Sequence, residues 1–505
     1  MATTGVSLMW LLDGIATVRQ NDARVEDLTL DSRMVRPGSL FFALRGLRAH
    51  GLDFVAEAVA RGASAVLWDP AEARGVHSPG VDIDVGAAFG APVAGLGALL
   101  GRIADRFFGW PSSQMRITGI TGTNGKTTCA YLLAECLQRL HADAAYIGTL
   151  GWGRPGALEA PTHTTPDVVN LHRQLSKLRA QGVRDVALEV SSHALDQGRI
   201  DGVQLHAAAF TNLTRDHLDY HVSMEAYGAA KARLFAVPDL KHVVVNIADD
   251  FGRELARGYS GRAPLTAVWV GAGASGWLAD SSLHADEVVL DLTGICLAVS
   301  GSFGTQTVKT RLLGRFNAEN AVVVLGCLTA LGVSLAEAAA ALAGCSAPPG
   351  RMEVIEAAGP PGLKAVIDYA HTPDALAKAL IALKEHCRGT LWCVFGCGGD
   401  RDAGKRPLMG AIADEWADEI IVTDDNPRSE DPETITNGIL LGFKTRRARV
   451  IHDRGQAIAT ALGEAAAGDL VLIAGKGHED YQIYGDVRRS FSDRDAALRS
   501  LGVAA

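Results

Sequence analysis

The sequence has 505 residues, of which 48% are hydrophobic and 21% are charged, and its formal net charge at pH 7 is -9. The length predicts about three domains, and the composition is that of a soluble globular protein with a large core. The acidic balance argues against nucleic acid or an anionic membrane as a partner, because both present phosphate groups that require a basic surface.

The N-terminal region predicts a small α/β domain. The chain starts without a basic segment and its first apolar run is short, so we expect neither a signal peptide nor a membrane span, and a cytoplasmic protein. Strand patterns follow at residues 39–44 and 64–68, with a helical pattern at 53–60. A linker punctuated by Gly, Pro and Ser begins at residue 107. We place the first domain boundary at residue 109.

A second region, residues 110–346, alternates strands with helices. An apolar strand at 116–120 leads into a Gly-rich turn and a helix from Lys126 to about Leu140. Further strand patterns lie at 144–150, 185–190, 207–213 and 242–247, with helices at 168–180, 224–235 and 318–331. Residues 266–313 have the pattern of short strands and an added β-ribbon. This alternation predicts a P-loop-type parallel sheet with helices on both faces.

The third region, residues 347–505, opens after a break at SAPPGR and alternates again. Strand patterns at 363–370, 390–396, 419–425 and 469–477 enclose helices at 373–386, 406–416 and 432–441. The pattern predicts a smaller, Rossmann-like doubly wound domain. The predicted fold is therefore α/β throughout, in three domains.

The eight cysteines are scattered along the chain. No CxxC pair is followed by a second pair or by spaced histidines, so a structural zinc site is not indicated. We expect buried free thiols, as in a protein of a reducing compartment.

The strongest local signal is TGTNGKTT, between a predicted strand and a predicted helix. Backbone N–H groups of such a turn, and of the helix that follows it, bind the phosphates of a nucleotide. Lys126 adds a positive charge, and the Thr127 hydroxyl is a ligand type that Mg²⁺ accepts. The spacing departs from the usual phosphate loop, because Ile120 stands where the first glycine is expected. The alternative is a Gly-rich turn without a ligand.

Segments spread over almost the whole chain resemble the Mur ligase superfamily, to which the folylpolyglutamate synthases also belong. They occur in the expected order, and their joint occurrence is far more specific than any one of them. The segments are LDSRMVRPGSLFFAL, TGTNGKTT, LEVSSHALDQGRI, FTNLTRDHLDYH, YGAAKARLF, GRFNAENA, PGRME, DYAHTPDAL, GCGGDRDAGKRPLMG, DDNPR and AGKGHEDYQ.

The resemblance implies ATP and Mg²⁺ as cofactors. Asn317 would also contact ATP, although on sequence alone it is equally a helix N-cap. The predicted ATP-binding residues are Gly122, Thr123, Asn124, Gly125, Lys126, Thr127, Thr128, Asn317, Arg351 and Asp368.

Four residues are implied as Mg²⁺ ligands: Thr127, Glu189, His217 and Lys231. With Lys126, the last three form the predicted catalytic set. Glu189 ends an apolar strand, and the alternative to a metal ligand there is a strand-end residue on a solvated rim. For His217 the alternative is an ordinary structural residue, which an isolated His more often is. Lys231 would serve as a carbamate, formed with CO₂, which needs an amine whose pKa is lowered by burial near other cations. On composition alone it is a surface lysine.

A nucleotide-sugar substrate is implied on the first two domains. LDSR resembles a uridine-binding segment, and His163 stands where the resemblance leads us to expect Asn. The predicted substrate residues are Leu30, Ser32, Leu47, Arg48, Ala49, His163, Thr164, Thr165, Ser191, Gln197 and Arg199.

DDNPR is the predicted specificity element of the third domain. In members of the family that add diaminopimelate, an Arg ends this motif, and a guanidinium binds the extra carboxylate of diaminopimelate in a bidentate pair. Asn-Pro is also a common turn signal, so the alternative is a turn. The predicted amino-acid site comprises Arg401, Asp425, Asn426, Pro427, Arg428, Gly475 and Glu479.

Taken together, the resemblance implies a monomeric ATP-dependent ligase that adds meso-2,6-diaminopimelate to UDP-N-acetylmuramoyl-L-alanyl-D-glutamate through an acyl phosphate. No nucleic acid and no membrane is expected as a partner. The alternatives are a lysine-adding ligase of the same family, a folylpolyglutamate synthase or, from another class, a P-loop nucleotide-binding switch. Arg428 argues against lysine, LDSRMVRPGSL argues against the folate enzyme, and a switch would not need DNPR and GKGHE on a second α/β domain.

Overall fold

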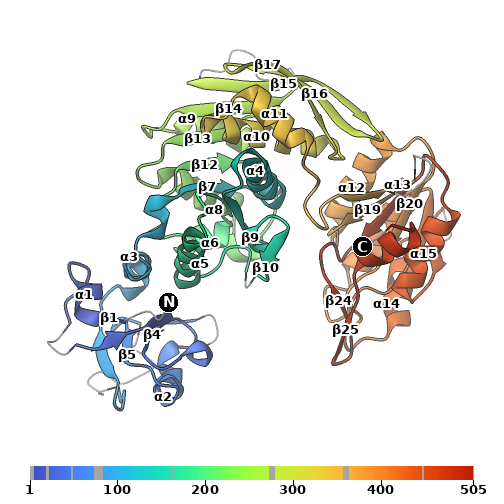
Figure 1. The fold of residues 1–505 in the computed structure, drawn as a ribbon. Helices are drawn as coiled ribbons and strands as arrows, with labels where there is room; N and C mark the ends of the chain where they lie inside the picture. The colour runs from blue at the N-terminus through green and yellow to red at the C-terminus, as the bar shows by residue number, and fades with distance from the viewer. Residues whose placement is uncertain are drawn as a thin grey trace.

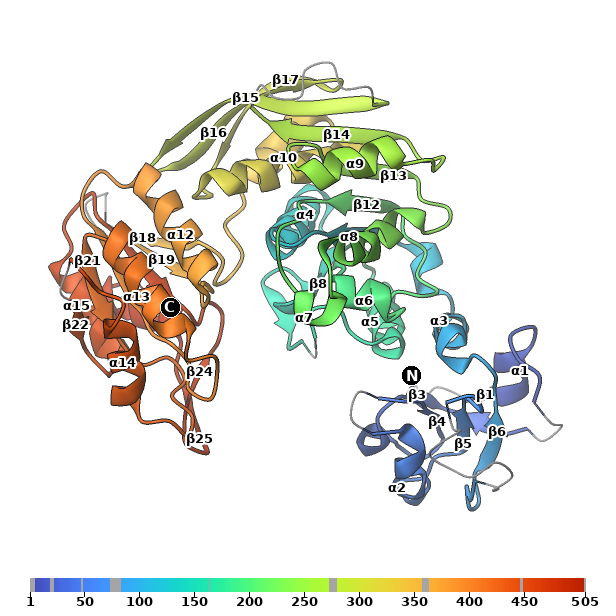
Figure 2. The same ribbon diagram turned by 180° about the vertical axis from the view of Figure 1, so that it is seen from behind.

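Three lobes follow one another along the chain in the computed structural model. The structure describes residues 5–18, 22–46, 49–72, 83–161, 163–271, 279–356, 363–445 and 448–503. The blue N-terminal lobe and the red C-terminal lobe lie on opposite sides of the central lobe, as both views show (Figure 1, Figure 2). The predicted α/β class is confirmed, with a separate sheet in each lobe.

The N-terminal lobe is built on four parallel strands in the order β3-β4-β5-β6. Apolar side chains on both faces of β4 are buried, which explains its uninterrupted run of hydrophobic residues. The elements are β1 (Val6–Ser7), α1 (Leu8–Leu12), β2 (Arg24–Val25), β3 (Asp27–Thr29), η1 (Ser32–Met34), β4 (Ser39–Ala43), η2 (Gly51–Phe54), α2 (Val55–Ala60), β5 (Ala65–Trp68), β6 (Phe89–Pro92), α3 (Leu96–Phe107) and η3 (Pro111–Gln114).

The central sheet has eleven strands in the order β10-β9-β8-β11-β7-β12-β13-β14-β15-β16-β17. Strands from β8 to β15 in this order are parallel, and the two strands at each end are antiparallel. The strands are β7 (Arg116–Thr121), β8 (Ala144–Gly148), β9 (Gly151–Arg154), β10 (Ala157–Glu159), β11 (Asp185–Glu189), β12 (Ala207–Phe210), β13 (His242–Asn246), β14 (Leu265–Val270), β15 (Ser281–Asp291), β16 (Gly294–Gly301) and β17 (Gly304–Thr310).

Helices cover both faces of this sheet, so strand side chains alternate between two cores. In β8, Tyr146 packs in the core beneath α4, α10 and α11, whereas Ala145 and Ile147 pack in the core beneath α5. The helices are α4 (Lys126–His141), α5 (Val168–Ala180), α6 (Ser192–Asp196), α7 (Leu218–His221), α8 (Met224–Ala232), η4 (Arg233–Ala236), α9 (Asp250–Gly258), α10 (Arg315–Ala330) and α11 (Leu335–Ala343).

The C-terminal lobe has a six-stranded sheet in the order β18-β19-β23-β20-β21-β22, parallel except for β18. Helices α12 to α14 pack on one face and α15 and α16 on the other. The elements are β18 (Glu353–Glu356), β19 (Lys364–Asp368), α12 (Pro373–His386), β20 (Leu391–Phe395), α13 (Lys405–Trp416), β21 (Glu419–Val422), α14 (Pro432–Leu440), β22 (Arg449–Val450), α15 (Arg454–Glu464), β23 (Leu470–Ala474), β24 (Tyr481–Tyr484), β25 (Val487–Ser490) and α16 (Asp493–Ser500).

The two junctions between the lobes differ in kind. Helix α3 approaches the loop after α6 so closely that a Cβ on Gly101 would lie 2.2 Å from the carbonyl oxygen of Asp201. At the other junction, His386 donates from Nδ1 to the Asp291 carbonyl (2.6 Å) and accepts from the Gly314 N–H at Nε2 (2.8 Å). Burial lowers the pKa of His386, which favours the neutral ring that this arrangement requires.

All eight cysteines are free thiols, as predicted, and six of them are buried. Cys136 and Cys345 lie in contact, with their sulfur atoms 3.5 Å apart. Within the described ranges, no helix combines the length and the apolar run that crossing a bilayer requires.

Candidate active site

The phosphate loop occupies the turn between β7 and α4, where the sequence predicts it. Gly122 and Gly125 have φ angles of +152° and +83°. A Cβ would lie 1.9 Å from Thr211 Oγ1 at the first position and 2.3 Å from Asn320 Oδ1 at the second. Only glycine fits at these two positions, because the backbone is pressed against the neighbouring loop and against α10.

Side chains after β12 hold the loop in place. Asn212 accepts from the backbone N–H of Thr123 at its carbonyl (2.8 Å) and from that of Asn124 at Oδ1 (2.9 Å). The Thr123 hydroxyl lies 3.2 Å from the hydroxyl of Tyr227. The sequence analysis did not identify Asn212 or Tyr227 as site residues. FTNL directly after a strand was the available signal for Asn212.

Two lysines meet at one carbonyl oxygen. Lys126 Nζ donates to the carbonyls of Gly122 and Thr123, both at 2.9 Å, and Lys231 Nζ donates to the same Gly122 carbonyl at 2.7 Å. Lys231 is 1% exposed and lies 4.2 Å from the ring centre of Tyr227. Burial, and then the charge of Lys126, lower the pKa of Lys231 to about 6. Lys231 is therefore largely a neutral amine at pH 7.

Glu189, at the carboxyl end of β11, is fully buried beside the phosphate loop. Its Oε2 accepts from the Thr127 hydroxyl at 3.0 Å, and its Oε1 accepts from the Thr149 N–H at 2.9 Å and from the Tyr146 hydroxyl. No lysine, arginine or histidine of the described chain lies within ion-pair distance of it. An anionic oxygen next to a threonine hydroxyl at a phosphate loop suits Mg²⁺, which prefers hard oxygen ligands.

His217 lies next to Tyr227 in a group of aromatic and histidine rings. Its ring centre is 6.0 Å from that of Tyr227 and 4.8 Å from that of His193, and its side chain is 45% exposed. Among the described residues, no three His, Cys, Asp or Glu side chains form a ready metal cage. Of the four predicted Mg²⁺ ligands, the structure thus brings Thr127 and Glu189 into direct contact and leaves His217 apart.

The predicted substrate residues of the central lobe form one hydrogen-bonded cluster. Thr165 donates to the Glu189 carbonyl (2.8 Å), and Arg199 donates to the Thr165 carbonyl (2.9 Å) and to Gln197 Oε1 (2.6 Å). Ser191 caps α6, and its backbone N–H donates to the Thr165 hydroxyl oxygen at 3.2 Å. Burial lowers the pKa of Arg199. Thr164 contacts Thr149 at 3.1 Å, and His163 is exposed.

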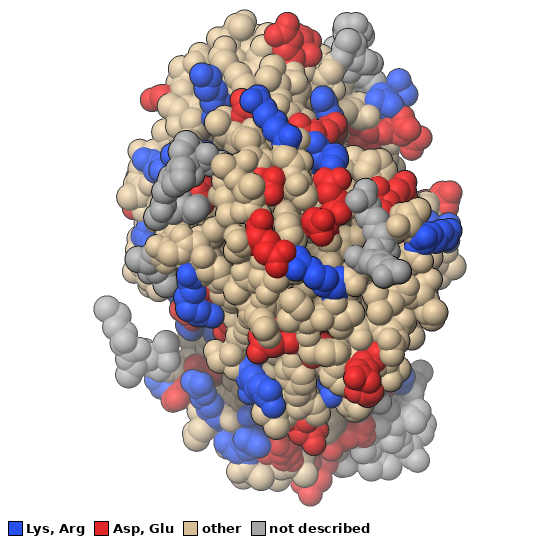
Figure 3. All heavy atoms as spheres, turned by 90° about the vertical axis from the view of Figure 1, so that its right-hand side faces the viewer, with Lys and Arg blue, Asp and Glu red and all other residues tan. Residues whose placement is uncertain are grey.

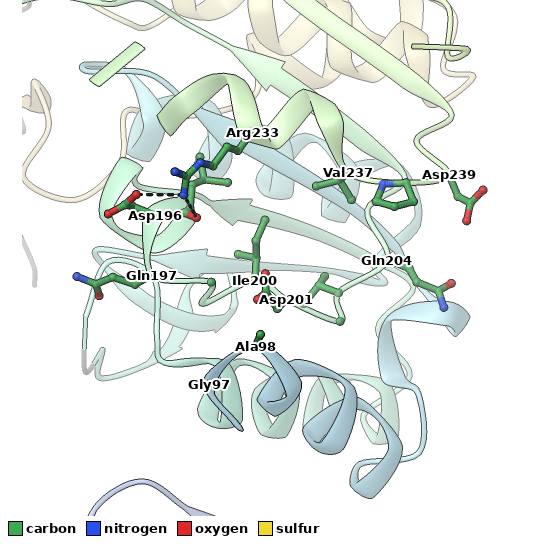
Figure 4. Close-up of a pocket in the computed structure, with 15 residues that line it drawn as sticks. Gly97, Ala98, Asp196, Gln197, Ile200, Asp201, Gln204, Arg233, Val237 and Asp239 are labelled. Atoms are coloured by element: carbon green, nitrogen blue, oxygen red, sulfur yellow. Dashed lines mark hydrogen bonds and ion pairs between the residues drawn. The ribbon is translucent and has the colours of Figure 1, made fainter. Parts of the chain in front are cut away.

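A pocket of about 740 Å³ lies beside this cluster, between α3 and the loop after α6 (Figure 4). Gln197 lines it, as do Asp201 and the Arg233–Asp196 ion pair, whose atoms are 3.0 Å apart. The pocket therefore adjoins the predicted nucleotide-sugar site at the junction of the N-terminal and central lobes.

The N-terminal lobe carries the rest of the predicted substrate site. Ser32 is buried and donates to Glu57 Oε2 at 2.7 Å, Leu30 is half-buried, and Ala49 is exposed. Leu47 and Arg48 lie outside the described residues.

Three predicted ATP contacts lie where the central and C-terminal lobes join. The positive charge of Arg351 lowers the pKa of Lys126, after the larger effect of burial, so the guanidinium acts on the phosphate loop. Arg351 stacks 4.9 Å from the ring centre of Tyr369. Asp368 accepts from the Met352 N–H at 2.8 Å, and burial raises the pKa of Asp368.

Asn317, a predicted ATP contact, is not a helix N-cap, so that alternative is excluded. Gly314 is the N-cap residue of α10, and Asn317 lies in the first turn of that helix. Its side chain donates to the Leu313 carbonyl (2.7 Å) and accepts from Asn320 (2.8 Å), whose own Oδ1 approaches Gly125. Asn317 therefore stabilises the wall against which the phosphate loop packs.

The predicted amino-acid site is formed by two loops, one after β21 and one after β23. Asp425 and Asn426 are buried in the first loop, and a Cβ on Gly475 of the second would lie 2.8 Å from Asp425 Oδ2. Asn426 Nδ2 donates to Glu479 Oε2 at 3.1 Å. The two sequence-distant motifs DDNPR and AGKGHE thus form a single structure.

Arg428 projects from this site with a constrained backbone. Its φ is +54°, and its N–H and carbonyl bond to Ile483 (3.0 Å) and Gly485 (2.6 Å) of the β24–β25 hairpin. The guanidinium donates to the Gly399 carbonyl at 2.7 Å, and no carboxylate of the described chain lies within ion-pair distance. It is therefore available for a carboxylate ligand. Pro427 is buried beside it, and Arg401 is exposed.

The three-lobed fold is that of an ATP-dependent acid–amino-acid ligase. The sequence matches the families described as "Mur ligase family, catalytic domain" over residues 24–107, "Mur ligase middle domain" over 120–328 and "Mur ligase, glutamate ligase domain" over 350–477. The chain belongs to the Mur ligase family.

Close relatives cover nearly the full length. The chain is 46% identical, over 97% of its length and 98% of the relative's, to a protein of Ectopseudomonas mendocina named UDP-N-acetylmuramoyl-L-alanyl-D-glutamate–2,6-diaminopimelate ligase. A Xanthomonas oryzae protein of the same name is 48% identical over 98% of this chain and 97% of its own. A solved structure of a ligase with that name matches with a TM-score of 0.71, 34% identity and 99% coverage of both chains.

The phosphate loop yields a test of its geometry. Gly125→Ala places a methyl group against Asn320, so the loop must shift, and we expect the Kd for ATP to rise at least about tenfold. Gly182→Ala is the matched control, because Gly182 has a similar φ of +80° with nothing within 4 Å of a Cβ. Calorimetric titration with ATP compares the two variants. Equal affinities would show that the close approach at Gly125 does not shape the ATP site.

Proposed function

We propose that this chain joins meso-2,6-diaminopimelate to UDP-N-acetylmuramoyl-L-alanyl-D-glutamate with hydrolysis of ATP to ADP and phosphate. The observation that carries the proposal is full-length similarity, at 46–48% identity, to ligases whose names state this reaction. The reaction belongs to peptidoglycan precursor synthesis and consumes cytoplasmic ATP. A lysine-adding enzyme, a folylpolyglutamate synthase and a nucleotide switch are not favoured by these relatives.

The reaction runs in two substitutions. The γ-carboxylate of D-glutamate attacks the γ-phosphorus of ATP, the bond to the β-phosphate oxygen breaks, and ADP leaves. The amine of diaminopimelate then attacks the acyl carbon, phosphate leaves, and the amine loses a proton as the amide forms. No covalent bond to the protein is required, so catalysis rests on positioning and charge neutralisation.

The central lobe supplies the phosphate-handling groups. Lys126 and the N–H groups in the first turn of α4 would face the β- and γ-phosphates, and Arg351 adds a second positive charge from the neighbouring lobe. Thr127 and Glu189 would hold Mg²⁺, which when bound neutralises phosphate charge. Gln197, Arg199 and the Thr165–Ser191 pair orient the peptide end of the nucleotide-sugar beside Glu189.

Lys231 acts through its neutral amine. A buried amine next to Lys126 favours loss of its proton, and a neutral amine adds to CO₂ to give a carbamate with release of one proton. The product places an anionic oxygen beside Lys126 and the Gly122 carbonyl. That charge would pair with the Lys126 ammonium group, and the carbamate would give Mg²⁺ a further oxygen ligand.

The C-terminal lobe selects the amino acid. The free guanidinium of Arg428 pairs with the distal carboxylate of diaminopimelate, which lysine lacks. Asp425 and Glu479 face the ammonium groups. Figure 3 shows the side of the molecule that lies at the right of Figure 1, where acidic and basic side chains are interspersed.

A ligation assay tests the function directly. We expect phosphate release from ATP only when the UDP-muramoyl dipeptide and diaminopimelate are both present, with a new amide product seen by mass spectrometry. Preference for L-lysine as the amine would replace the proposal with the lysine-adding reaction. ATP turnover without either acceptor would point to the nucleotide switch.

Arg428→Ala tests the specificity assignment. Loss of one charge-assisted pair predicts a fall in kcat/KM for diaminopimelate of about 10- to 100-fold, with KM for ATP unchanged. Turnover with L-lysine, which lacks the second carboxylate, should be much less affected. Arg401→Ala, on the exposed rim of the same site, provides a comparison. An equal loss with both amines would mean that Arg428 does not read the distal carboxylate.

Lys231→Ala tests the carbamate. The variant should lose most of its activity, on the order of 100-fold, because an anionic group next to the phosphates is removed. Acetate or propionate should partly restore it by supplying a carboxylate in the vacated space. Lys241→Ala, on an exposed lysine, is the control. Labelling with ¹³CO₂ should give a carbamate NMR signal in the wild type alone. Full activity of Lys231→Ala would rule the carbamate out.

A further inference from the structure

Lys476 lies between the two loops of the amino-acid site and none of its surface is exposed. It is part of AGKGHE, on the loop that follows β23. A fully buried lysine costs free energy unless its ammonium group is paired and hydrogen-bonded. The groups that partner Lys476 therefore show what this charge is retained for.

Its partners are two residues of the predicted amino-acid site. Lys476 Nζ lies 3.0 Å from Glu479 Oε2 and 3.4 Å from Asn426 Oδ1. Asn426 closes the triangle, since its Nδ2 donates to the same Glu479 oxygen at 3.1 Å. The Ile483 N–H also donates to Asn426 Oδ1, at 3.0 Å. Lys476 thus links the DDNPR loop, its own loop and the hairpin that holds Arg428.

The two oxygens of the Glu479 carboxylate have different surroundings. Oε2 accepts from both Lys476 and Asn426, whereas no donor of the described chain is within hydrogen-bonding distance of Oε1. The side chain of Glu479 is 19% exposed, and that of Lys476 is not exposed at all. One carboxylate oxygen is therefore fixed by the protein, and the other is available to a ligand ammonium group.

The same loop is packed firmly from behind. Gly477 has a φ of +53°, and a Cβ there would lie 2.8 Å from Tyr369 Cβ. A Cβ on Gly350 would lie 2.2 Å from the His478 N–H nitrogen. The loop backbone is thus fixed against the segment that carries Arg351, so Lys476 can orient Glu479 against a rigid support.

We propose that Lys476 is a positioning residue of the amino-acid site, which orients Glu479 and Asn426 so that one Glu479 oxygen receives an ammonium group of the diamino acid. The inference rests on the proposed ligase function and adds a residue to its acceptor site. Lys476 does not touch the substrate, because its ammonium group is enclosed by the triangle and by Tyr481, whose ring centre is 5.2 Å away. It acts through Glu479.

Lys476→Met tests the proposal in the full-length enzyme, because it keeps the buried volume and removes the charge. We expect KM for diaminopimelate to rise at least about tenfold while KM for ATP changes less than about twofold. Lys364→Met is the control, since Lys364 is a 9% exposed lysine of the same lobe that pairs with Glu356 at 2.5 Å, away from the two loops. A purely structural role would change both KM values or neither, and either result overturns the proposal.

A double variant distinguishes an effect on the orientation of Glu479 from a loss of protein stability. Lys476→Met leaves the Glu479 charge uncompensated, whereas Lys476→Met with Glu479→Gln removes both charges and folds even where the single variant does not. If Lys476 acts through Glu479, the double variant has the same KM for diaminopimelate as Glu479→Gln alone, within about twofold. A further tenfold rise in the double variant would mean that Lys476 acts independently, and would overturn the proposal.

Failure of the proposed function has a different signature. Wild-type protein that forms no amide with diaminopimelate rejects the ligase, whatever the variants do. Wild-type protein that ligates normally, together with an unchanged KM in Lys476→Met, rejects only the positioning role.

Discussion

Two lysine amino groups donate to one buried carbonyl oxygen, and their proximity determines which of them carries a charge. Lys126 and Lys231 both donate to Gly122, inside a turn whose glycines allow no side chain. Two ammonium groups so close in a poorly solvated site repel each other strongly, so the free energy is lowest when one of them is neutral. Lys231 is the one whose pKa falls to about 6. In the proposed reaction, the loop thereby offers one cation to ATP and one neutral amine for carbamate formation.

The remaining groups follow from sheet geometry. In a parallel sheet the carboxyl ends of all strands meet at one edge, where helix N-termini and polar loops gather. The predicted phosphate loop follows β7, Glu189 ends β11, and Asn212 lies just after β12; these three strands are adjacent in the central sheet. In the C-terminal sheet, Asp425 and Gly475 follow β21 and β23 in the same way. The buried Arg454 joins these two strand ends, since it donates to the carbonyls of Asp424 and Ala474.

Periodicity predicted the elements whose burial pattern is regular. The helices at 168–180 and 373–386 are α5 and α12 with the same bounds, because an N-cap side chain begins each of them, Asp167 and Thr372. Helix α11 was not predicted, although Ser334 and Glu337 form a capping box, because its Ala-rich face gives little contrast between polar and apolar positions. The small hairpin β24–β25 was also missed.

Site residues were also easier to predict from local sequence motifs than from contacts between segments that are far apart in the chain. Tyr146, Asn212 and Lys476 were not predicted as site residues, although Asn212 and Lys476 lie inside segments that carry the family resemblance. Each of the three has at least one partner that is distant in sequence. Tyr146 reaches Glu189 across neighbouring strands, and no local pattern marks a strand tyrosine as a partner of a carboxylate. The N-cap alternative for Asn317 failed because Gly314, with a φ of +89°, caps α10 three residues earlier in the chain.

The arrangement of the lobes is itself part of the chemistry. An acyl phosphate is hydrolysed by water, so the amine must reach it in a site from which water is excluded. Yet the phosphate loop and the Arg428 site lie on different lobes, and no hydrogen bond or ion pair of the described chain joins the two.

The C-terminal lobe meets the central lobe at His386, whose neutral ring bridges Gly314 and Asp291. The Arg315–Glu385 ion pair, at 3.8 Å, adds to this junction, whereas α3 is packed on the Asp201 loop with no room for a Cβ at Gly101. We therefore expect the C-terminal lobe to move toward the phosphate loop when ATP is bound, while the N-terminal lobe keeps its place. A contact between bound ATP and Arg351 would then stabilise the position in which the amino-acid site lies next to the acyl phosphate. The amine would therefore reach that position only when ATP is present to form the intermediate.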